Sequence, residues 1–308
     1  MSNPSSISVA DYRPSPALDA ELAELAYASV RGWPDQRPIT PALVRSRLRA
    51  AGDAPPTSLA FHRDNAGRLK AAAALRWPSR SHAVGRIWGP IVHPTAQRRG
   101  LGRALLDELG ARTAGVDGRV TTAEIPGTRH HGRALFQAAG WAPTGTSSLL
   151  RCDLPLAAPA HPRLRFRQPE PGERLDDIVA EQYEHTYPGT HHDTAQETLA
   201  RWSADERFSP ASLTLAEDRQ GIAAVALAYP LAHTDPVEPA EALLGDLVVR
   251  PGEPTPGLLR RDVGIRALNV AAGHGARVGR IVTGDAHLAR ALVQVGFVLL
   301  DTIIYYEA

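Results

Sequence analysis

The segment that decides the fold is Val-His-Pro-Thr-Ala-Gln-Arg-Arg-Gly-Leu-Gly-Arg, residues 92–103. The apolar run 87–92 predicts a strand before it, and residues 100–112 predict an amphipathic helix after it. The glycine-rich link therefore stands at a helix N-terminus, where unpaired N–H groups and the helix dipole favour an anion such as phosphate. Gly100 and Gly102 would let a diphosphate approach the backbone without meeting a Cβ atom.

The spacing in this segment differs from two common nucleotide-binding loops. A P-loop needs Lys-Ser or Lys-Thr after its second glycine, and here Arg103-Ala104 stand in that place. A dinucleotide-binding loop has three glycines in Gly-x-Gly-x-x-Gly order, and residues 100–105 contain only two. Residues 97–102 instead resemble the coenzyme A loop of the GNAT acetyltransferases, which is Gln/Arg-x-x-Gly-x-Gly/Ala after a strand that ends Val-x-Pro. The strand end Val92-His93-Pro94 matches that context.

The resemblance implies direct transfer of an acyl group from acetyl-CoA to an amine, and it implies which residues hold the donor. The backbone of Ile91 and Val92 would bond the pantetheine arm, at the place where this strand and the next one, residues 119–125, separate. His131 stands three residues before Ala134, where the family often has asparagine, and is a further coenzyme contact. The predicted coenzyme-binding residues are Ile91, Val92, Gln97, Arg98, Arg99, Gly100, Leu101, Gly102, Arg103 and His131.

Attack by an amine needs a proton acceptor and a group that protonates the leaving thiolate. The resemblance implies that Glu124, near the end of the strand 119–125, is the base, and the alternative is a surface carboxylate at a strand end. His131 is either an alternative base or an exposed residue at a helix start. Many family members place a tyrosine four positions before a Gly-Phe or Gly-Trp pair as the acid, but this chain has Phe136 there. The sequence does not identify the residue that protonates the thiolate.

The chain is also a divergent repeat. Pro94 and Pro251 lie 157 positions apart, and Gly140 and Gly296 lie 156 positions apart, each pair in similar surroundings. Each copy predicts the order strand, helices, three strands, helix, strand, helix, strand. The predicted fold class is therefore α/β, with two tandem GNAT-like domains that each have a mixed central sheet flanked by helices. A proline-rich linker at 153–162 places the boundary near residue 158, giving domains 1–158 and 159–308.

Only the first copy keeps an intact coenzyme loop. At the repeat offset, Pro254 and Pro256 remove two backbone donors, and Leu259 stands where the diphosphate would approach. Asp262 is expected to add an unfavourable negative charge near the same helix start. We therefore expect the second domain not to bind coenzyme A at this loop, and to have a structural or substrate-shaping role.

Composition narrows the partners. The 308 residues suit two domains, and a net charge of +1 with scattered arginines predicts neither a nucleic-acid nor a membrane partner. The single cysteine, Cys152, excludes an intramolecular disulfide and a cysteine-based zinc site. His130-His131 and His191-His192 lack partners at ligand spacing, so no metal is expected. The chain shows no signal-peptide pattern and no apolar run of membrane length, which predicts a cytoplasmic protein.

The acceptor is expected to be a small-molecule amine. In the GNAT fold the acceptor site is usually walled by the helices after the first strand, here within residues 18–51, and the segment 33–37 supplies an aromatic side chain and charges of both signs. One alternative donor is an acyl carrier protein in specialised metabolism, although the loop favours free coenzyme A because a carrier presents no diphosphate. A second alternative is a non-catalytic acyl-CoA sensor. The sequence does not determine the oligomeric state.

Overall fold

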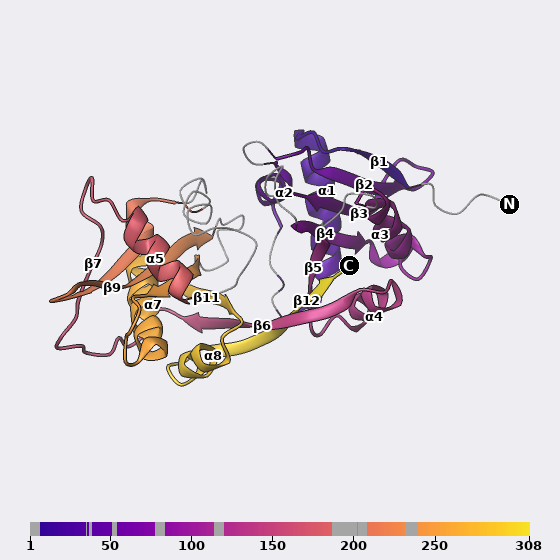
Figure 1. Ribbon diagram of the computed structural model, residues 1–308. Helices are drawn as coiled ribbons and strands as arrows, with labels where there is room; N and C mark the ends of the chain where they lie inside the picture. The colour runs from indigo at the N-terminus through magenta and orange to yellow at the C-terminus, as the bar shows by residue number, and fades with distance from the viewer. Residues whose placement is uncertain are drawn as a thin grey trace. The chain divides into compact units, whose positions relative to one another are not determined.

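The structure is a computed structural model, and it describes residues 7–34, 36, 39–50, 54–77, 84–113, 120–186, 202, 208–231 and 240–308. The chain forms two compact units, here called unit 1 and unit 2, whose elements are labelled in Figure 1. Unit 1 contains Met1–Thr146 and Asp301–Ala308, and unit 2 contains Ser147–Leu300. Each unit has strands in a mixed sheet with helices packed on it, which confirms the predicted α/β class.

Unit 1 is built on strands in the order β1-β2-β3-β4-β5-β12. Neighbours from β1 to β4 are antiparallel, β4 and β5 are parallel, and β5 is antiparallel to β12. The four alanines at 71–74 of β3 are 0 % exposed, as expected for a strand that is covered on both faces. The elements are β1 (Ser8–Asp11), α1 (Pro16–Val30), α2 (Pro41–Leu48), β2 (Ser58–Arg63), β3 (Leu69–Arg76), β4 (Val84–Val92), the short 3-10 helix η1 (Pro94–Ala96), α3 (Leu101–Ala111), β5 (Val120–Pro126), α4 (His130–Ala138) and β12 (Val298–Glu307).

Helices cover both faces of this sheet. On the face called here the α1 face, α1 and α2 pack against the strands through a cluster that includes Leu22 and Val44. On the opposite face, the α3 face, α3 and α4 pack through a cluster that includes Leu105 and Phe136. Because successive side chains of a strand point to opposite faces, neighbouring residues of β5 and of β12 lie on different faces of the sheet. This alternation determines which side chains of β5 and β12 share a face and can contact one another.

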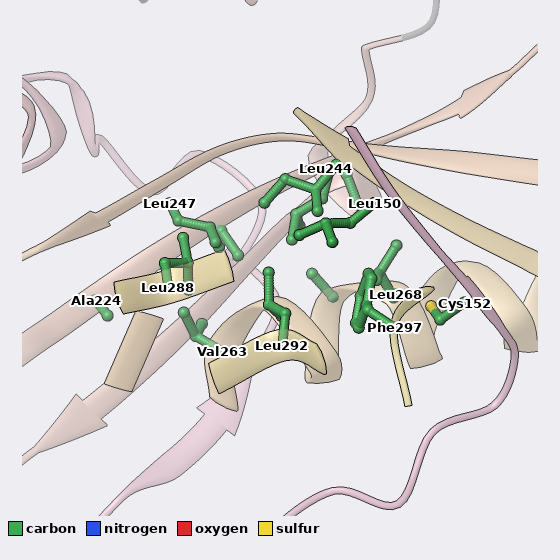
Figure 2. Close-up of a cluster of buried hydrophobic side chains, with 14 of the residues drawn as sticks. Leu150, Cys152, Ala224, Leu244, Leu247, Val263, Leu268, Leu288, Leu292 and Phe297 are labelled. Atoms are coloured by element: carbon green, nitrogen blue, oxygen red, sulfur yellow. The ribbon is translucent and has the colours of Figure 1, made fainter. Parts of the chain in front are cut away.

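Unit 2 repeats the arrangement with strands in the order β6-β11-β10-β9-β8-β7. Its core, drawn in Figure 2, joins Leu244 and Leu247 of β10 to Val263 and Leu268 of α7 and to Leu292 of α8. The elements are β6 (Ala142–Asp153), β7 (Arg165–Arg167), α5 (Asp176–Thr186), the short helix η2 (Pro210–Ser212), β8 (Leu213–Asp218), β9 (Gly221–Leu231), β10 (Glu241–Val249), α7 (Pro256–Gly273), β11 (Val278–Thr283) and α8 (Ala286–Val293).

The closing strand of each repeat lies in the sheet of the other repeat. β6, the last strand of the first repeat, pairs antiparallel with β11 in unit 2. β12, the last strand of the second repeat, pairs antiparallel with β5 in unit 1, with Tyr305 opposite Glu124 and Tyr306 opposite Ala123. The compact units therefore do not coincide with the sequence repeats 1–158 and 159–308. Composition and linker signals carry no information about which sheet a closing strand joins.

We expect a chain that ends at residue 300 to lose ordered structure in β5. Ile303 and Tyr306 are 9 % and 1 % exposed in unit 1, so the truncation empties part of its core and leaves one edge of β5 unpaired. Loss of the buried aromatic side chain alone destabilises by about 3–5 kcal/mol. Hydrogen exchange of the β5 amides measures the effect, with β8 and β9 of unit 2 as the internal control. Unchanged protection of β5 would contradict this role for β12.

Candidate donor and catalytic site

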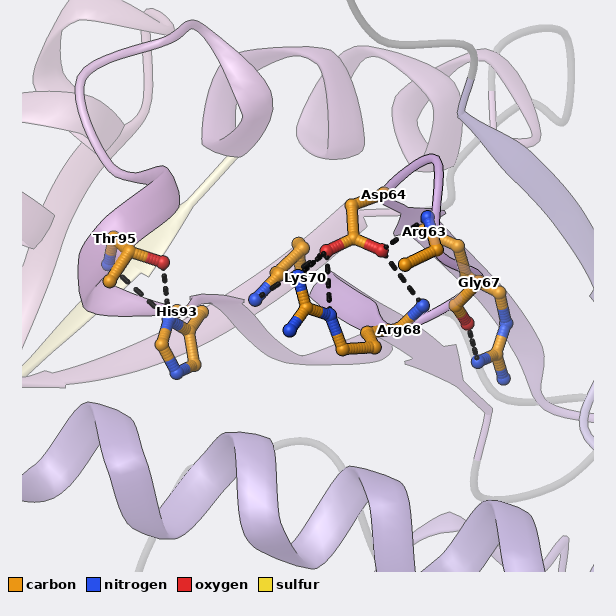
Figure 3. Close-up of polar contacts among 8 residues, drawn as sticks. Arg63, Asp64, Gly67, Arg68, Lys70, His93 and Thr95 are labelled. Carbon is orange, nitrogen blue, oxygen red and sulfur yellow. Dashed lines mark hydrogen bonds and ion pairs between the residues drawn. The ribbon is translucent and has the colours of Figure 1, made fainter.

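The turn after β4 is held by local hydrogen bonds. The backbone N–H of His93 donates to the carbonyl of Lys70 in β3 at 2.8 Å. The His93 ring nitrogen Nδ1 accepts from the backbone N–H of Thr95 at 3.3 Å, and the Gln97 side chain donates to the carbonyl of Val92 at 3.1 Å. Figure 3 shows His93 and Thr95 together with Lys70, which pairs with Asp64 of the β2–β3 turn at 3.7 Å. The start of the glycine-rich loop is therefore anchored to β3.

The next residues present backbone donors to solvent. Arg98 and Gly100 have φ values of 63° and 81°, in the left-handed region, and both flank the exposed Arg99. Among the described residues, no protein group accepts a hydrogen bond from the N–H of these three residues. The first N–H groups of α3, which begins at Leu101, are also unpaired by helix geometry. Successive free N–H groups at a helix start form an anion-binding concavity.

The two glycines of the loop have different roles. A Cβ atom on Gly100 would meet no atom within 4 Å, so only its backbone conformation and the approach of a ligand favour glycine. A Cβ atom on Gly102 would stand 2.8 Å from Cδ2 of Leu135 in α4. The absence of a side chain at Gly102 therefore lets α3 pack closely on α4, a reason that the sequence pattern did not suggest.

The arginines of the loop also differ. Arg98 approaches His131, with 3.3 Å between its Nη1 and the ring nitrogen Nδ1, so two predicted coenzyme contacts from distant segments lie together. Arg103 instead donates to Asp107 at 2.7 Å and to the carbonyl of Ala138 at 2.8 Å, which ties α3 to the end of α4. Arg99 is exposed and has no polar partner among the described residues. Arg99 is the arginine most available to a phosphate group.

The strands beside the loop separate where the thioester was predicted to lie. Parallel pairing of β4 with β5 runs from Val84 opposite Val120 to Ile87 opposite Ala123 and goes no further. Beyond that point, Ile91 and Val92 pair with β3, and the β5 residues that follow Ala123 pair with β12. Beyond Ile87, the edge of β4 that faces β5 thus has no partner strand, as the predicted pantetheine contact requires, although the Val92 carbonyl accepts from the Gln97 side chain.

Glu124 lies at this separation and is exposed. Its neighbours Ala123 and Ile125 belong to the cluster on the α3 face, so the Glu124 side chain projects to the α1 face. Its cross-strand neighbour is Tyr305 of β12. An exposed carboxylate at this place is compatible with both the predicted base and the surface alternative, and its role stays a prediction.

The sequence did not reveal a buried carboxylate in the same unit. Asp301, at 6 % exposure, accepts from the Trp33 indole at 2.6 Å and from the Thr128 hydroxyl at 2.5 Å. Burial raises its pKa, but hydrogen bonds from Thr128, Trp33 and backbone N–H groups outweigh this and hold the pKa below its ordinary value. Asp301 thereby joins β12 to the turn before α4 and to the segment after α1. Asp35 and Arg37 of the predicted acceptor segment lie outside the described residues.

The start of the corresponding loop of unit 2 is held by ion pairs. Arg250 binds Asp218 at 2.8 Å and Glu253 at 2.6 Å, so two carboxylates already pair with its guanidinium group. The expectation that Asp262 opposes an anion is wrong, because this residue is 2 % exposed and binds Arg261 at 2.5 Å as well as His161. The lost donors at the prolines remain the reason to expect no coenzyme there.

A cavity of ≈ 400 Å³ lies in unit 2 near the place where β10 and β11 separate. Arg260 is buried in its wall and donates to Asp285 at 2.7 Å and to the carbonyl of Leu247 at 3.1 Å. Unit 2 therefore keeps open space at its strand separation although Pro254 and Pro256 remove two backbone donors from its loop. The cavity is lined by Tyr183, Thr186, Asp246, Arg260, Thr283 and Asp285, among others.

Two other features of the chain bear on its chemistry. Cys152 is 2 % exposed, and burial raises the pKa of its thiol to about 12, so it is not an activated nucleophile. Among the described residues, no three His, Cys, Asp or Glu side chains gather as a metal site would need. His191-His192 lie outside these residues. None of the helices described has the length and hydropathy of a membrane span.

These features define an α/β protein of two repeated units, one of which has an exposed loop with unpaired N–H groups beside two parallel strands that separate. Residues 22–141 match the sequence model of the acetyltransferase (GNAT) family. No curated protein sequence matches the chain significantly.

Solved structures resemble the chain over its length. A tandem GNAT protein from the clavulanic acid biosynthesis pathway has a TM-score of 0.75 at 19 % identity, covering 98 % of each chain. A GCN5-related N-acetyltransferase from Sphaerobacter thermophilus has 0.76 at 17 %, covering 98 % of this chain and 95 % of that one. N-myristoyltransferase of Saccharomyces cerevisiae with bound myristoyl-CoA has 0.63 at 13 %, covering 98 % and 79 %. Residues 22–141 thus carry the sequence pattern of the GNAT family, as predicted, and the whole chain has the fold of tandem GNAT proteins.

We expect Asp301→Asn to lower the free energy of unfolding by about 2 kcal/mol at neutral pH, because it removes the charge from a buried hydrogen-bond acceptor. The folded-state pKa lies below the ordinary value of 3.8, so this contribution is present above that value and is lost as pH falls through the folded pKa. Denaturant titrations of wild type and variant should therefore converge on acidification. Asp153→Asn, at a side chain that is 85 % exposed, is the control. A pH-independent difference would refute the assignment.

Proposed function

We propose that the chain transfers an acyl group, most simply acetyl, from coenzyme A to the amino group of a small molecule. The observation that carries this proposal is the exposed loop at 98–100, whose N–H groups lack protein acceptors, next to the unpaired edge of β4. A diphosphate fits the first feature, and an amide-containing arm such as pantetheine fits the second. The loop favours free coenzyme A over a carrier protein, whose arm has a single phosphate.

Each predicted donor contact has a distinct part in this proposal. The N–H groups of 98–102 and the Arg99 guanidinium bind the diphosphate, and Arg98 with His131 forms a second cationic or polar wall. Ile91 and Val92 align the arm along β4. The other four predicted residues shape the loop and the helix after it. Gln97 bonds to Val92, and Leu101 is buried in the core. Gly102 leaves room for Leu135, and Arg103 bonds to Ala138.

Glu124 is proposed as the base for the acceptor amine. The amine nitrogen attacks the thioester carbon, the C–N bond forms, the C–S bond breaks, and Glu124 takes the proton from nitrogen directly or through water. Because Glu124 projects to the α1 face, the acceptor would approach from that face, on which Trp33 is fixed by Asp301. A small acceptor is supported by the likeness to a tandem GNAT protein from the clavulanic acid biosynthesis pathway. Unit 2 would shape the substrate site or act structurally.

Calorimetry should show that acetyl-CoA binds more tightly than its pantetheine fragment, since only the former offers the diphosphate. Arg99→Ala should weaken acetyl-CoA binding about 10-fold through loss of a charge-assisted bond, and should leave pantetheine binding unchanged. Arg112→Ala, which removes an exposed charge at the far end of α3, is the matched control. Equal affinity for both ligands would favour a carrier-protein donor.

Thiol release over an amine library tests turnover. Glu124→Gln should lower kcat by about 100-fold or more, the usual contribution of a general base, with donor KM little changed. Glu108→Gln, at an exposed position of α3, controls for loss of a carboxylate. Full activity in Glu124→Gln would support the surface-carboxylate alternative, and tight donor binding without any thiol release would support the sensor.

A further inference from the structure

The proposed reaction leaves a thiolate that needs a proton. Phe136, at the α4 position where the sequence led us to look for an acid, has no proton to give. It is 1 % exposed, packs edge-on to Trp141 with 4.9 Å between ring centroids, and stacks on Tyr306 at 5.5 Å. The ring next to Phe136 therefore carries a phenolic hydroxyl, and it comes from β12.

Tyr306 stands at the point where the strands separate. It lies opposite Ala123 of β5, and Ala123 lies opposite Ile87 of β4 in the last β4–β5 pair before the separation. All three side chains belong to the cluster on the α3 face, and the alanine in the middle of this row is small. Tyr306 thus lies on the α3 face, one strand away from the point where β4 and β5 separate and where the proposed thioester would lie.

The hydroxyl of Tyr306 lacks a partner in the part of the chain that is described. Two other buried tyrosines of the chain have one, since Tyr12 donates to Asp19 at 2.6 Å and Tyr229 donates to the carbonyl of Trp202 at 3.4 Å. Tyr306 is the most buried of the three, at 1 % exposure, yet its hydroxyl bonds to no described residue. Unlike the hydroxyls of Thr57 and Thr214, which are enclosed and unpaired, the Tyr306 hydroxyl keeps some accessible surface, so a ligand or a water molecule can contact it.

We propose that Tyr306 is the proton donor for the leaving thiolate, supplied to unit 1 by the last strand of the second repeat. This inference rests on the proposed function. As the C–S bond breaks, the electron pair goes to sulfur, and the Tyr306 hydroxyl transfers its proton to that sulfur to give the thiol. The phenolate regains a proton from solvent, and the proton of the amine leaves through the base. The hydroxyl that Phe136 lacks is thus carried by the ring stacked on it.

The neighbouring tyrosine provides a matched control. Tyr305 is one residue earlier in β12, lies opposite Glu124, and belongs to the α1 face. It shares the strand and the residue type with Tyr306 but not the stacking on Phe136. Removing its hydroxyl should therefore not affect protonation of the thiolate.

The test measures thiol release with acetyl-CoA and an amine that wild type accepts. Tyr306→Phe should lower kcat by about 100-fold, the lower end of the range for general acid catalysis, with the donor KM and the calorimetric affinity for coenzyme A within about twofold. Adding Phe136→Tyr to Tyr306→Phe should recover most of the lost kcat, because the hydroxyl returns on the adjacent ring. Tyr305→Phe should keep the wild-type kcat, and thermal unfolding confirms that each variant is folded.

The outcomes separate this inference from the function on which it rests. Wild-type turnover with an unchanged kcat in Tyr306→Phe overturns the inference alone. An equal loss in Tyr305→Phe, or a loss that Phe136→Tyr does not recover, also overturns it, since a structural effect would then suffice. If wild type releases no thiol with any amine, the proposed function fails and the inference falls with it.

Discussion

The pairing of β12 with β5 is the interaction on which the rest of unit 1 depends. An unpaired strand edge is unstable and prone to non-native association, and β12 covers one edge of β5 from Thr122 to Pro126. The same pairing places Tyr306 in the core and lets Asp301 accept a hydrogen bond from Thr128 in the turn before α4. With that edge secured, β5 can leave β4 after Ala123, and the opposite edge becomes available to a ligand.

The two repeats share one topology and differ in the loop that follows the fourth strand of each, after β4 in unit 1 and after β10 in unit 2. In unit 1 the loop after β4 is anchored by His93 and Gln97 and leaves its later N–H groups free. In unit 2 the loop after β10 draws Arg250 into pairs with Asp218 and Glu253. The backbone paths differ, because Arg98 and Gly100 have left-handed φ values, whereas Thr255 does not and Gly257 already lies within α7. A cavity persists at the strand separation of unit 2, so the loss of the loop did not require loss of the space.

Sequence reasoning succeeded where the determinants are local. The strand before residue 92, the helix after Gly100 and the element order follow from periodicity and turn residues, and the repeat follows from spacing. It was incomplete where one residue has two roles. Gly102 was explained by ligand approach, yet it also admits Leu135, and Asp262 was judged by its charge without its partners Arg261 and His161.

The sequence by itself determined the fold class, the tandem organisation and the location of the glycine-rich loop after β4, because local patterns and repeat spacing encode them. Only the tertiary structure decided which sheet each closing strand joins. Asp301 meets Trp33, and Tyr306 meets Phe136, across separations that no periodicity encodes. Strand pairing depends on the backbone edges and on packing across the whole unit, so the residues that complete unit 1 become visible only when the chain is folded.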